Sequence, residues 1–172
     1  MGLVMLDLDG TLVESSLVEI DGKLQPAPGI FSEPRLQPNV LEKIADLADE
    51  GDEFAIVTNQ GGVAWGYATP AEAYARIGRA VALLHGFFGR PFSVHVCFAH
   101  PRATIKQYRE GHERRKPAPA MLREALKAHG REGLYPDQPP EDAIMVGDLE
   151  DDEKAARAAG VDFVPAGTFF TW

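Results

Sequence analysis

The sequence predicts an α/β fold of three layers, in which helices cover both faces of a mostly parallel sheet. Short apolar runs of the kind that form buried strands alternate with segments whose apolar residues recur at helical spacing. Strands that alternate with helices form parallel sheets. The 172 residues suffice for one domain with a substantial core, so we expect a single domain over residues 1–172.

The first half of the chain supplies two strands, one helix and a long connection. Residues 2–6 are an apolar run that predicts the first strand. Residues 13–35 lack periodicity and contain five glycines and prolines, which predicts a long excursion of the functional or disordered type. Apolar residues at helical spacing then predict a helix over 38–51, with a glycine as its stop signal. The run EFAIV, residues 53–57, predicts a buried strand.

The second half repeats this alternation. Pro70 opens a helix in which Ala73, Ile77, Ala80 and Leu84 recur at core spacing. The elements expected after it are a strand at 93–98, a polar loop at 100–115, a helix around 121–126, a strand at 143–146, a helix at 152–159 and a strand at 161–164.

Composition excludes several classes of protein. A chain with 45% hydrophobic and 25% charged residues has the composition of a soluble globular protein, and no segment approaches the roughly 18 apolar residues of a membrane span. The N-terminus lacks the features of a signal peptide, and the single cysteine, Cys97, precludes an intramolecular disulfide. We therefore expect a cytoplasmic monomer or small homo-oligomer with no membrane partner. The net charge of -9 disfavours sequence-independent nucleic-acid binding, unless a local basic patch overrides it.

Two carboxylates follow the first strand in the stretch LVMLDLDGTL. An unpaired buried carboxylate is costly, so Asp7 and Asp9 need a compensating partner or a chemical role. One ionised carboxylate can attack as a nucleophile while the other gives and takes protons. Gly10 lets the backbone approach a ligand closely, and Thr11 can orient its neighbours. The alternative is a turn in which both aspartates only bond to local amides.

Three more polar segments follow expected strands or begin expected helices. VTNQGG offers the Thr58 hydroxyl, the Asn59 amide and glycines whose backbone amides can hold phosphate oxygens. Lys116 precedes a helix-starting proline, and Asp148 is a hard oxygen ligand of the type that magnesium prefers. The alternatives are a plain strand-to-helix turn, a solvated lysine and an acidic helix cap. Because ligands bind at the carboxyl ends of parallel strands, we expect these residues and Asp7 to converge on one rim.

In this order and strand context, DLDGTL, VTNQGG, RRKP and GDLEDD resemble the four motifs of the haloacid dehalogenase-like phosphatases. The motifs span nearly the whole chain. The resemblance implies a Rossmann-like α/β/α fold and a reaction in which Asp7 forms an aspartyl-phosphate. It also implies that Asp9 protonates the leaving oxygen and then activates water. The implied cofactor is Mg²⁺, held by Asp7, the backbone carbonyl of Asp9 and Asp148.

The same resemblance assigns the phosphoryl group to three residues. Thr58, Asn59 and Lys116 are expected to hold it, because the group carries spread negative charge during transfer. Asp152 is expected to orient Lys116 or metal-bound water rather than bind the metal directly. Thr11 is expected to contact the substrate.

The segments TNQGG and RRKPAPAML resemble motifs of the subgroup that contains histidinol-phosphate and heptose-bisphosphate phosphatases. These have no large cap domain, and 172 residues leave no room for one. The expected partner is therefore a small phosphorylated metabolite: a sugar phosphate or bisphosphate, or a compound of the histidinol-phosphate type. Arg115 matches the arginine of the RKP motif and is expected to contact the substrate, with a solvated arginine as the alternative.

Members of this subgroup commonly bind zinc in a loop patterned CxH and then CxC before RKP. Here Cys97 is in place, but Ala99 stands at the histidine position, and His112 and Arg114 stand where the two cysteines would be. A structural zinc site needs four soft or imidazole ligands, and Cys97, His100 and His112 supply at most three. We therefore expect no zinc and assign these histidines to the surface or to a substrate loop.

Three alternatives for the function stay open. A polynucleotide 3′-phosphatase has similar DLDGTL and TNQ motifs and would use the basic residues Arg102, Lys106, Arg109, Arg114 and Arg115. The net charge and the lack of a kinase-like phosphate loop make a nucleic-acid end a less favoured substrate than a small metabolite. A non-catalytic binding module is opposed by the presence of every residue that the chemistry needs. A phosphoacceptor like a response regulator is opposed by Asp9. The loops 13–35, 61–69 and 99–115 hold the residues that discriminate substrates.

Overall fold

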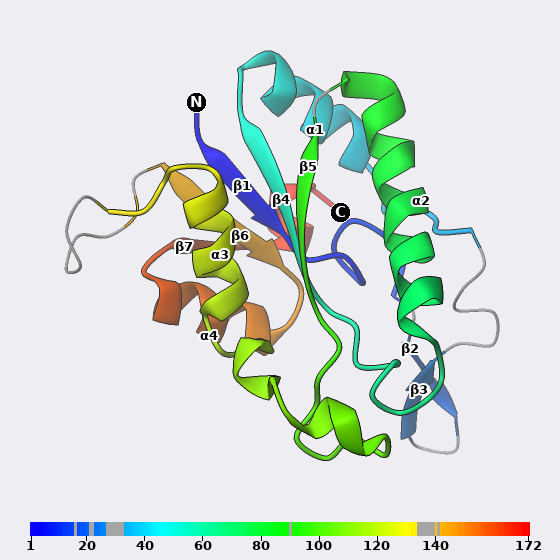
Figure 1. Ribbon diagram of the computed structural model, residues 1–172. Coiled ribbons are helices and arrows are strands. Elements are labelled where there is room, and N and C mark those ends of the chain that lie inside the picture. The colour runs from blue at the N-terminus through cyan, green and yellow to red at the C-terminus, as the bar shows by residue number, and fades with distance from the viewer. Residues whose placement is uncertain (16, 21–22, 27–32, 90, 134–139, 141) are drawn as a thin grey trace.

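A five-stranded parallel sheet forms the centre of the computed structural model (Figure 1). The structure describes residues 1–15, 17–20, 23–26, 33–89, 91–133, 140 and 142–172. The strand order is β5-β4-β1-β6-β7, and every neighbouring pair is parallel. The strands are β1 (Leu3–Leu6), β4 (Glu53–Asn59), β5 (Phe92–Cys97), β6 (Ala143–Gly147) and β7 (Asp162–Pro165). The parallel sheet predicted from the alternation of strands and helices is confirmed.

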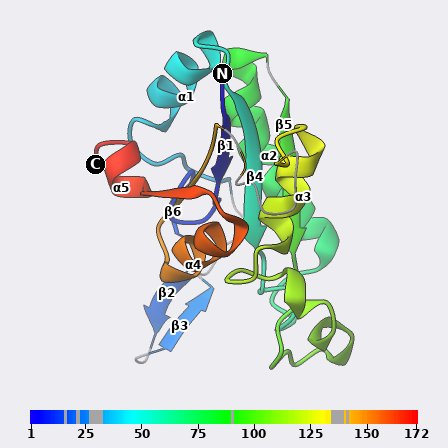
Figure 2. The ribbon, with the colours of Figure 1, turned by 90° about the vertical axis from the view of Figure 1, so that its left-hand side faces the viewer.

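Helices cover both faces of this sheet, which confirms the predicted three layers. One face packs against α1 (Val40–Asp49), α2 (Pro70–Phe88) and α5 (Ala166–Phe169), and the other against α3 (Ala120–Ala128) and α4 (Glu150–Ala159). Figure 2 shows the sheet from the side of α3 and α4. Side chains alternate along β1, so Val4 and Leu6 join the first core while Leu3 and Met5 join the second. A strand buried on both faces is a continuous apolar run, as the sequence has it.

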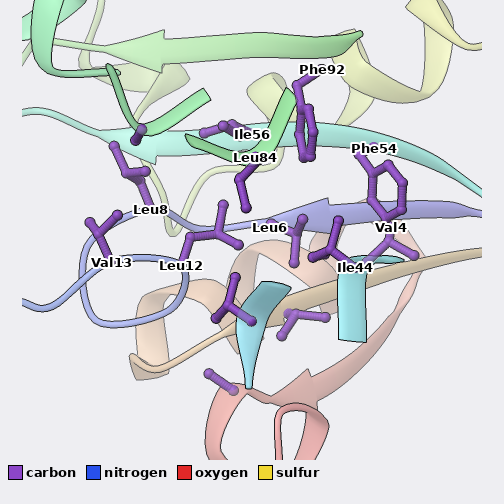
Figure 3. Close-up of a cluster of buried hydrophobic side chains, with 14 of the residues drawn as sticks. Val4, Leu6, Leu8, Leu12, Val13, Ile44, Phe54, Ile56, Leu84 and Phe92 are labelled. Carbon is purple, nitrogen blue, oxygen red and sulfur yellow. The ribbon is translucent and has the colours of Figure 1, made fainter. Parts of the chain in front are cut away.

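The core on the side of α1 and α2 holds the sheet rigid beneath the strand ends (Figure 3). Phe54 of β4 and Phe92 of β5 stack with their ring centroids 5.2 Å apart. Ile44 of α1 and Leu84 of α2 are buried in the same cluster. Each such side chain contributes about 1.5–3 kcal/mol when it leaves water. The loops at the strand ends are therefore anchored on a packed support.

The segment 13–35 differs from the expectation of a long irregular excursion. It contains β2 (Leu17–Ile20) and β3 (Lys23–Pro26), which form an antiparallel pair. Figure 2 shows this pair at the lower edge of the molecule. Strands of four residues leave too little alternation in the sequence for recognition. The positions 16, 21–22 and 27–32 of this segment lie outside the described residues.

The polar segment 100–115 was expected to be a loop, and it contains two 3₁₀ helices, η1 (Lys106–Arg109) and η2 (His112–Arg114). The Ile105 amide donates to the Ala64 carbonyl at 3.1 Å, so this segment braces the loop that follows β4. Short 3₁₀ turns have no sequence period long enough to predict them. Among the described residues, no helix has both the length and the apolar character that crossing a membrane requires.

Candidate active site

The carboxyl ends of β1, β4 and β6 meet at one rim, where a cavity of about 590 Å³ opens. The sheet register aligns Leu6 with Ile56 and with Val146, so the residues that follow these three positions lie side by side. The predicted site residues that line the cavity are Asp7, Asp9, Thr58, Asn59, Arg115, Lys116, Asp148 and Asp152. The structure thus brings together residues that the sequence spreads over 145 positions, from Asp7 to Asp152.

Lys116 stands at the centre of this cluster and is buried, with 2% relative exposure. Its ammonium contacts Asp7 Oδ1 at 2.6 Å, Asp152 Oδ1 at 2.6 Å and the Val57 carbonyl at 2.7 Å. These three contacts use all three N–H donors of the ammonium. Burial lowers the pKa of Lys116, but Asp7 and Asp152 outweigh that effect and raise it above its usual value. The ammonium is therefore a fixed positive charge.

Asn59 holds the backbone of Lys116. Its Nδ2 donates to the Lys116 carbonyl at 3.0 Å, and its Oδ1 accepts from the Lys116 amide at 3.1 Å. This clasp joins the end of β4 to the segment before α3 and was not expected from the sequence. The amide nitrogen carries a second N–H and Asn59 lines the cavity, so its contact with a phosphoryl group stays a prediction.

The carboxylates outnumber the cations that neutralise them. Burial raises the pKa of Asp7 to about 7, with Lys116 opposing the rise and Asp152 and Asp9 adding to it. Burial, together with Asp152, also raises the pKa of Asp148. Each of Asp7, Asp148 and Asp152 has a ligand atom within 4.8 Å of the other two. This excess of hard anionic oxygens fits a divalent cation such as Mg²⁺.

Asp152 differs from the other two members of that trio, because both its oxygens have protein partners. Oδ1 contacts Lys116, and Oδ2 accepts from the Leu149 amide at 3.0 Å at the start of α4. The carboxylate therefore orients the lysine and caps the helix at once. The action of Asp152 through Lys116 stays a prediction, which these contacts allow.

Two glycines let the acids approach the strand ends. A Cβ on Gly147 would lie 2.5 Å from the Cβ, Cγ and Oδ2 of Asp152. Gly10 has φ +89°, and a Cβ there would overlap the Asp148 carboxylate. Side chains at either position would push a carboxylate out of the site.

Thr11 requires a correction. It is fully buried and does not line the cavity, so it does not take the substrate-binding role expected for it. Its hydroxyl instead donates to Asp148 Oδ1 at 3.3 Å, because the turn after β1 folds the side chain back under the rim. We therefore assign Thr11 to the orientation of Asp148.

Asp9 is held by two residues that the sequence analysis did not single out. Arg76 Nη2 contacts Asp9 Oδ1 at 2.5 Å, and Gln60 Nε2 donates to Asp9 Oδ2 at 2.7 Å. The same Gln60 nitrogen lies 3.0 Å from the Thr58 hydroxyl oxygen. One sequence signal could have found Arg76: it lies next to Ile77 and three positions after Ala73, on the face of the helix with core spacing.

Arg115 and an apolar wall form the outer part of the cavity. The Arg115 guanidinium lies 3.2 Å from where a Cβ on Gly61 would be, and its buried Nη1 has no hydrogen-bond partner. Burial lowers the pKa of this arginine. An unpartnered buried N–H beside a cavity suits an anionic ligand. Trp65 and Tyr67, which the sequence analysis also missed, line the same opening and are partly exposed.

The three candidate zinc ligands have other neighbours. The Cys97 thiol faces the Ala99 and Gly111 carbonyls at 4.0 and 3.8 Å. His100 Nδ1 accepts from the Arg102 amide, and His112 Nδ1 lies 2.9 Å from the Arg109 carbonyl. Within the described ranges, the one trio of Cys, His, Asp or Glu ligand atoms close enough to share a metal is the aspartate trio. The absence of zinc stays a prediction.

Comparisons with known proteins identify the family of the chain. A family model described as HAD-hydrolase-like matches residues 113–168. A D-glycero-beta-D-manno-heptose-1,7-bisphosphate 7-phosphatase of Pseudomonas putida is 33% identical over 163 residues, which cover 93% of this chain and 79% of that protein. Its namesake in Vibrio cholerae is 31% identical, over 92% of this chain and 76% of that protein. The chain belongs to the HAD-like phosphatases.

Two solved structures are similar over nearly the whole chain. A D,D-heptose 1,7-bisphosphate phosphatase from B. bronchiseptica, complexed with magnesium and phosphate, has a TM-score of 0.69 at 26% identity. The match covers 96% of this chain and 79% of that one. A putative HAD-like phosphatase from Mesorhizobium loti has a TM-score of 0.69 at 30% identity, over 94% of this chain and 69% of that one. The family resemblance drawn from the motifs is confirmed, and this HAD-like phosphatase is a phosphoric monoester hydrolase.

The close approach at Gly147 predicts the effect of a single methyl group. Gly147→Ala should displace Asp152 and lower the free energy of unfolding by about 1–3 kcal/mol, because the Asp152 side chain already fills the space that the new methyl group would enter. Gly78→Ala is the matched control, since a Cβ there meets nothing within 4 Å and alanine favours a helix interior by up to about 1 kcal/mol. Urea denaturation of both variants measures the difference. Equal stability of the two variants would show that Asp152 is not held where the structure has it.

The purified protein should contain no stoichiometric zinc, because its candidate ligands are too few and do not gather at one point. Elemental analysis after purification without chelator is the measurement. One zinc per chain would contradict the prediction and would require a rearrangement of the segment from Cys97 to His112.

Proposed function

We propose that this chain is an Mg²⁺-dependent phosphomonoesterase that acts through an aspartyl-phosphate on a small phosphorylated metabolite. The observation that carries the proposal is the pair of Asp7 and Lys116, a buried carboxylate and a buried ammonium in contact at the wall of the cavity. A carboxylate fixed in this way keeps one oxygen for attack, while the lysine supplies positive charge for the phosphoryl group.

The first half of the proposed reaction transfers the phosphoryl group to the protein. An oxygen of the Asp7 carboxylate forms a bond to phosphorus, and the bond from phosphorus to the leaving oxygen breaks with its electron pair. The leaving oxygen takes a proton from the Asp9 carboxyl. Lys116 and Thr58, which line the same cavity, stabilise the charge on the phosphoryl oxygens.

The second half releases inorganic phosphate. Asp9 takes a proton from water, the water oxygen bonds to phosphorus, and the bond to Asp7 breaks with its electron pair returning to the carboxylate. The two aspartates thus regain their initial states.

Asp7, Asp148 and the backbone carbonyl of Asp9 would hold Mg²⁺, and Asp152 would act through Lys116. The ion supplies Lewis-acid stabilisation of the negative charge on the phosphoryl group. The chemistry of the donors and the excess of carboxylates support this set. Thr11 contributes by orienting Asp148.

The cavity supports a small substrate. A volume of about 590 Å³ falls within the range of small-molecule sites. Arg115 offers a guanidinium to a second anionic group, such as the other phosphate of a sugar bisphosphate. The relatives from Pseudomonas putida and Vibrio cholerae bear the name of a sugar-bisphosphate phosphatase, which points to the same class. We therefore propose a sugar phosphate, a sugar bisphosphate or a compound of the histidinol-phosphate type.

The positions of the basic residues favour a small substrate over the 3′-phosphate end of a polynucleotide. Of the five basic residues proposed for a nucleic-acid groove, Arg115 lines the cavity. Arg114 forms two hydrogen bonds with Glu124, at 2.9 and 2.6 Å, and Arg109 Nε donates to the Ala103 carbonyl. Arg102 and Lys106 are exposed and do not line the cavity.

We further propose that the chain forms one domain, that it is located in the cytoplasm, and that it is a monomer or a small homo-oligomer.

Replacement of the proposed nucleophile tests the mechanism. Asp7→Asn should lower the rate of phosphomonoester hydrolysis by at least about 10³-fold, since an amide oxygen is a far weaker nucleophile than a carboxylate. The assay is phosphate release from a panel of sugar phosphates, sugar bisphosphates and histidinol phosphate, with and without Mg²⁺. Circular dichroism checks that the variant folds.

Asp46→Asn is the matched control, because Asp46 is exposed on α1 and does not line the cavity. Full activity of Asp7→Asn would refute the role of Asp7. Preferred hydrolysis of a 3′-phosphorylated oligonucleotide, with a steep loss of affinity at high salt, would replace the small metabolite by a nucleic-acid end.

Asp148→Ala should raise the Mg²⁺ concentration for half-maximal activity by at least about tenfold, because a hard anionic ligand is lost. Glu150→Ala is the control, since Glu150 pairs with Lys154 on the surface of α4. Titration of activity with Mg²⁺ compares the two. An unchanged requirement in Asp148→Ala would leave Asp148 without a role at the metal.

A further inference from the structure

The carboxylate of Asp9 is fixed by two side chains from outside the turn that carries it. Arg76 Nη2 lies 2.5 Å from Oδ1, and Gln60 Nε2 lies 2.7 Å from Oδ2. The Arg76 side chain is only 5% exposed, and the Asp9 side chain 19%. Asp9 and Gln60 line the cavity, whereas Arg76 does not. The arginine therefore contacts the aspartate without itself lining the cavity.

The position of Arg76 on α2 is unusual for a charged residue. Ala73, Ile77 and Ala80 on the same helix are buried, and Arg76 lies among them with 4% relative exposure. A buried guanidinium is costly unless a charged partner compensates it. The ion pair that the structure gives Arg76 is with Asp9, 67 residues earlier in the chain. The guanidinium on the core face of α2 thus forms an ion pair with the loop after β1.

The backbone beneath Asp9 is also fixed. The Gly10 amide donates to the Val13 carbonyl at 2.8 Å, and the Leu12 amide donates to the Leu8 carbonyl at 3.0 Å. With the backbone held by this turn, Arg76 and Gln60 set the remaining freedom of the carboxylate. The two oxygens of a carboxyl group offer about four lone-pair sites, these two donors use two of them, and one of the others can carry the proton that Asp9 transfers. The others can face a leaving oxygen or a water molecule.

We propose that Arg76 is a positioning residue for Asp9, which holds the carboxyl group where it exchanges a proton with the leaving oxygen of the substrate. This inference rests on the proposed function, in which Asp9 is the acid. Proton transfer depends on distances of hydrogen-bond length, so a carboxyl group that rotates freely spends little time in reach.

The effect of losing the Arg76 contact should depend on the leaving group of the substrate. A poor leaving group such as an alkoxide needs the proton from Asp9 as its bond to phosphorus breaks. A good leaving group such as p-nitrophenolate departs without it. Loss of the Arg76 contact should therefore slow the first kind of substrate and spare the second, whereas general damage to the fold slows both.

The experiment measures kcat/KM for benzyl phosphate and for p-nitrophenyl phosphate, two substrates of similar size, in the full-length protein with Mg²⁺. In Arg76→Leu we expect a loss of about 10- to 100-fold for benzyl phosphate. For p-nitrophenyl phosphate we expect a loss below about threefold. Both assays use one preparation, so the ratio does not depend on the fraction of folded protein. Arg76→Lys should restore part of the loss, because an ammonium can contact the one carboxylate oxygen that Arg76 contacts, but it sits on a flexible stem rather than on a rigid planar group.

Arg79→Leu is the matched control. It removes the same charge from the same helix, at a residue that pairs with Glu33 at 3.6 Å and does not line the cavity. Its ratio of the two kcat/KM values should equal that of the wild type. Equal losses on both substrates in Arg76→Leu would overturn the positioning role and leave Arg76 as a structural residue. A wild-type protein that hydrolyses neither substrate nor any member of the metabolite panel would refute the proposed function itself.

Discussion

The buried ammonium of Lys116 is the interaction on which the rest of the site depends. Removing a lysine from water is costly, and the structure compensates it with Asp7, Asp152 and the Val57 carbonyl. These partners come from the loop after β1, from α4 and from β4. One charge thus fixes the relative positions of three segments that are far apart in the sequence. It also answers why Asp7 can sit buried at the end of an apolar strand.

The architecture explains how these segments reach one point. In a parallel sheet the carboxyl ends of neighbouring strands share an edge, and the packed cores on both faces hold that edge rigid. Gly147 and Gly10 then remove the side chains that would keep the acids apart. The outcome is a cavity lined on one part by the charged cluster around Lys116 and on another by apolar and aromatic side chains together with Arg115. Such a division suits a phosphorylated small molecule, with its phosphate inside and its leaving group outside.

The sequence predicts the sheet, its layers and the rim because each depends on local patterns. Apolar runs predict strands, and polar residues directly after them predict where side chains converge. What it did not predict depends on contacts between distant residues: the clasp of Asn59 on Lys116, the contact of Thr11 with Asp148, and the tether of Asp9 by Gln60 and Arg76. The β2–β3 pair escaped because its strands are too short to show a period. The core spacing of Arg76 was visible, but its partner could not be identified without the fold.

The proposed mechanism requires that the Asp7 carboxylate becomes covalently phosphorylated. Rapid acid quench during turnover, followed by mass spectrometry of proteolytic peptides, measures this directly, because acyl phosphates survive at low pH. We expect a phosphate on the peptide from the N-terminal strand, located at Asp7 and absent in Asp7→Asn. Turnover of substrate with no phosphorylated peptide, or with the phosphate on another residue, would contradict it.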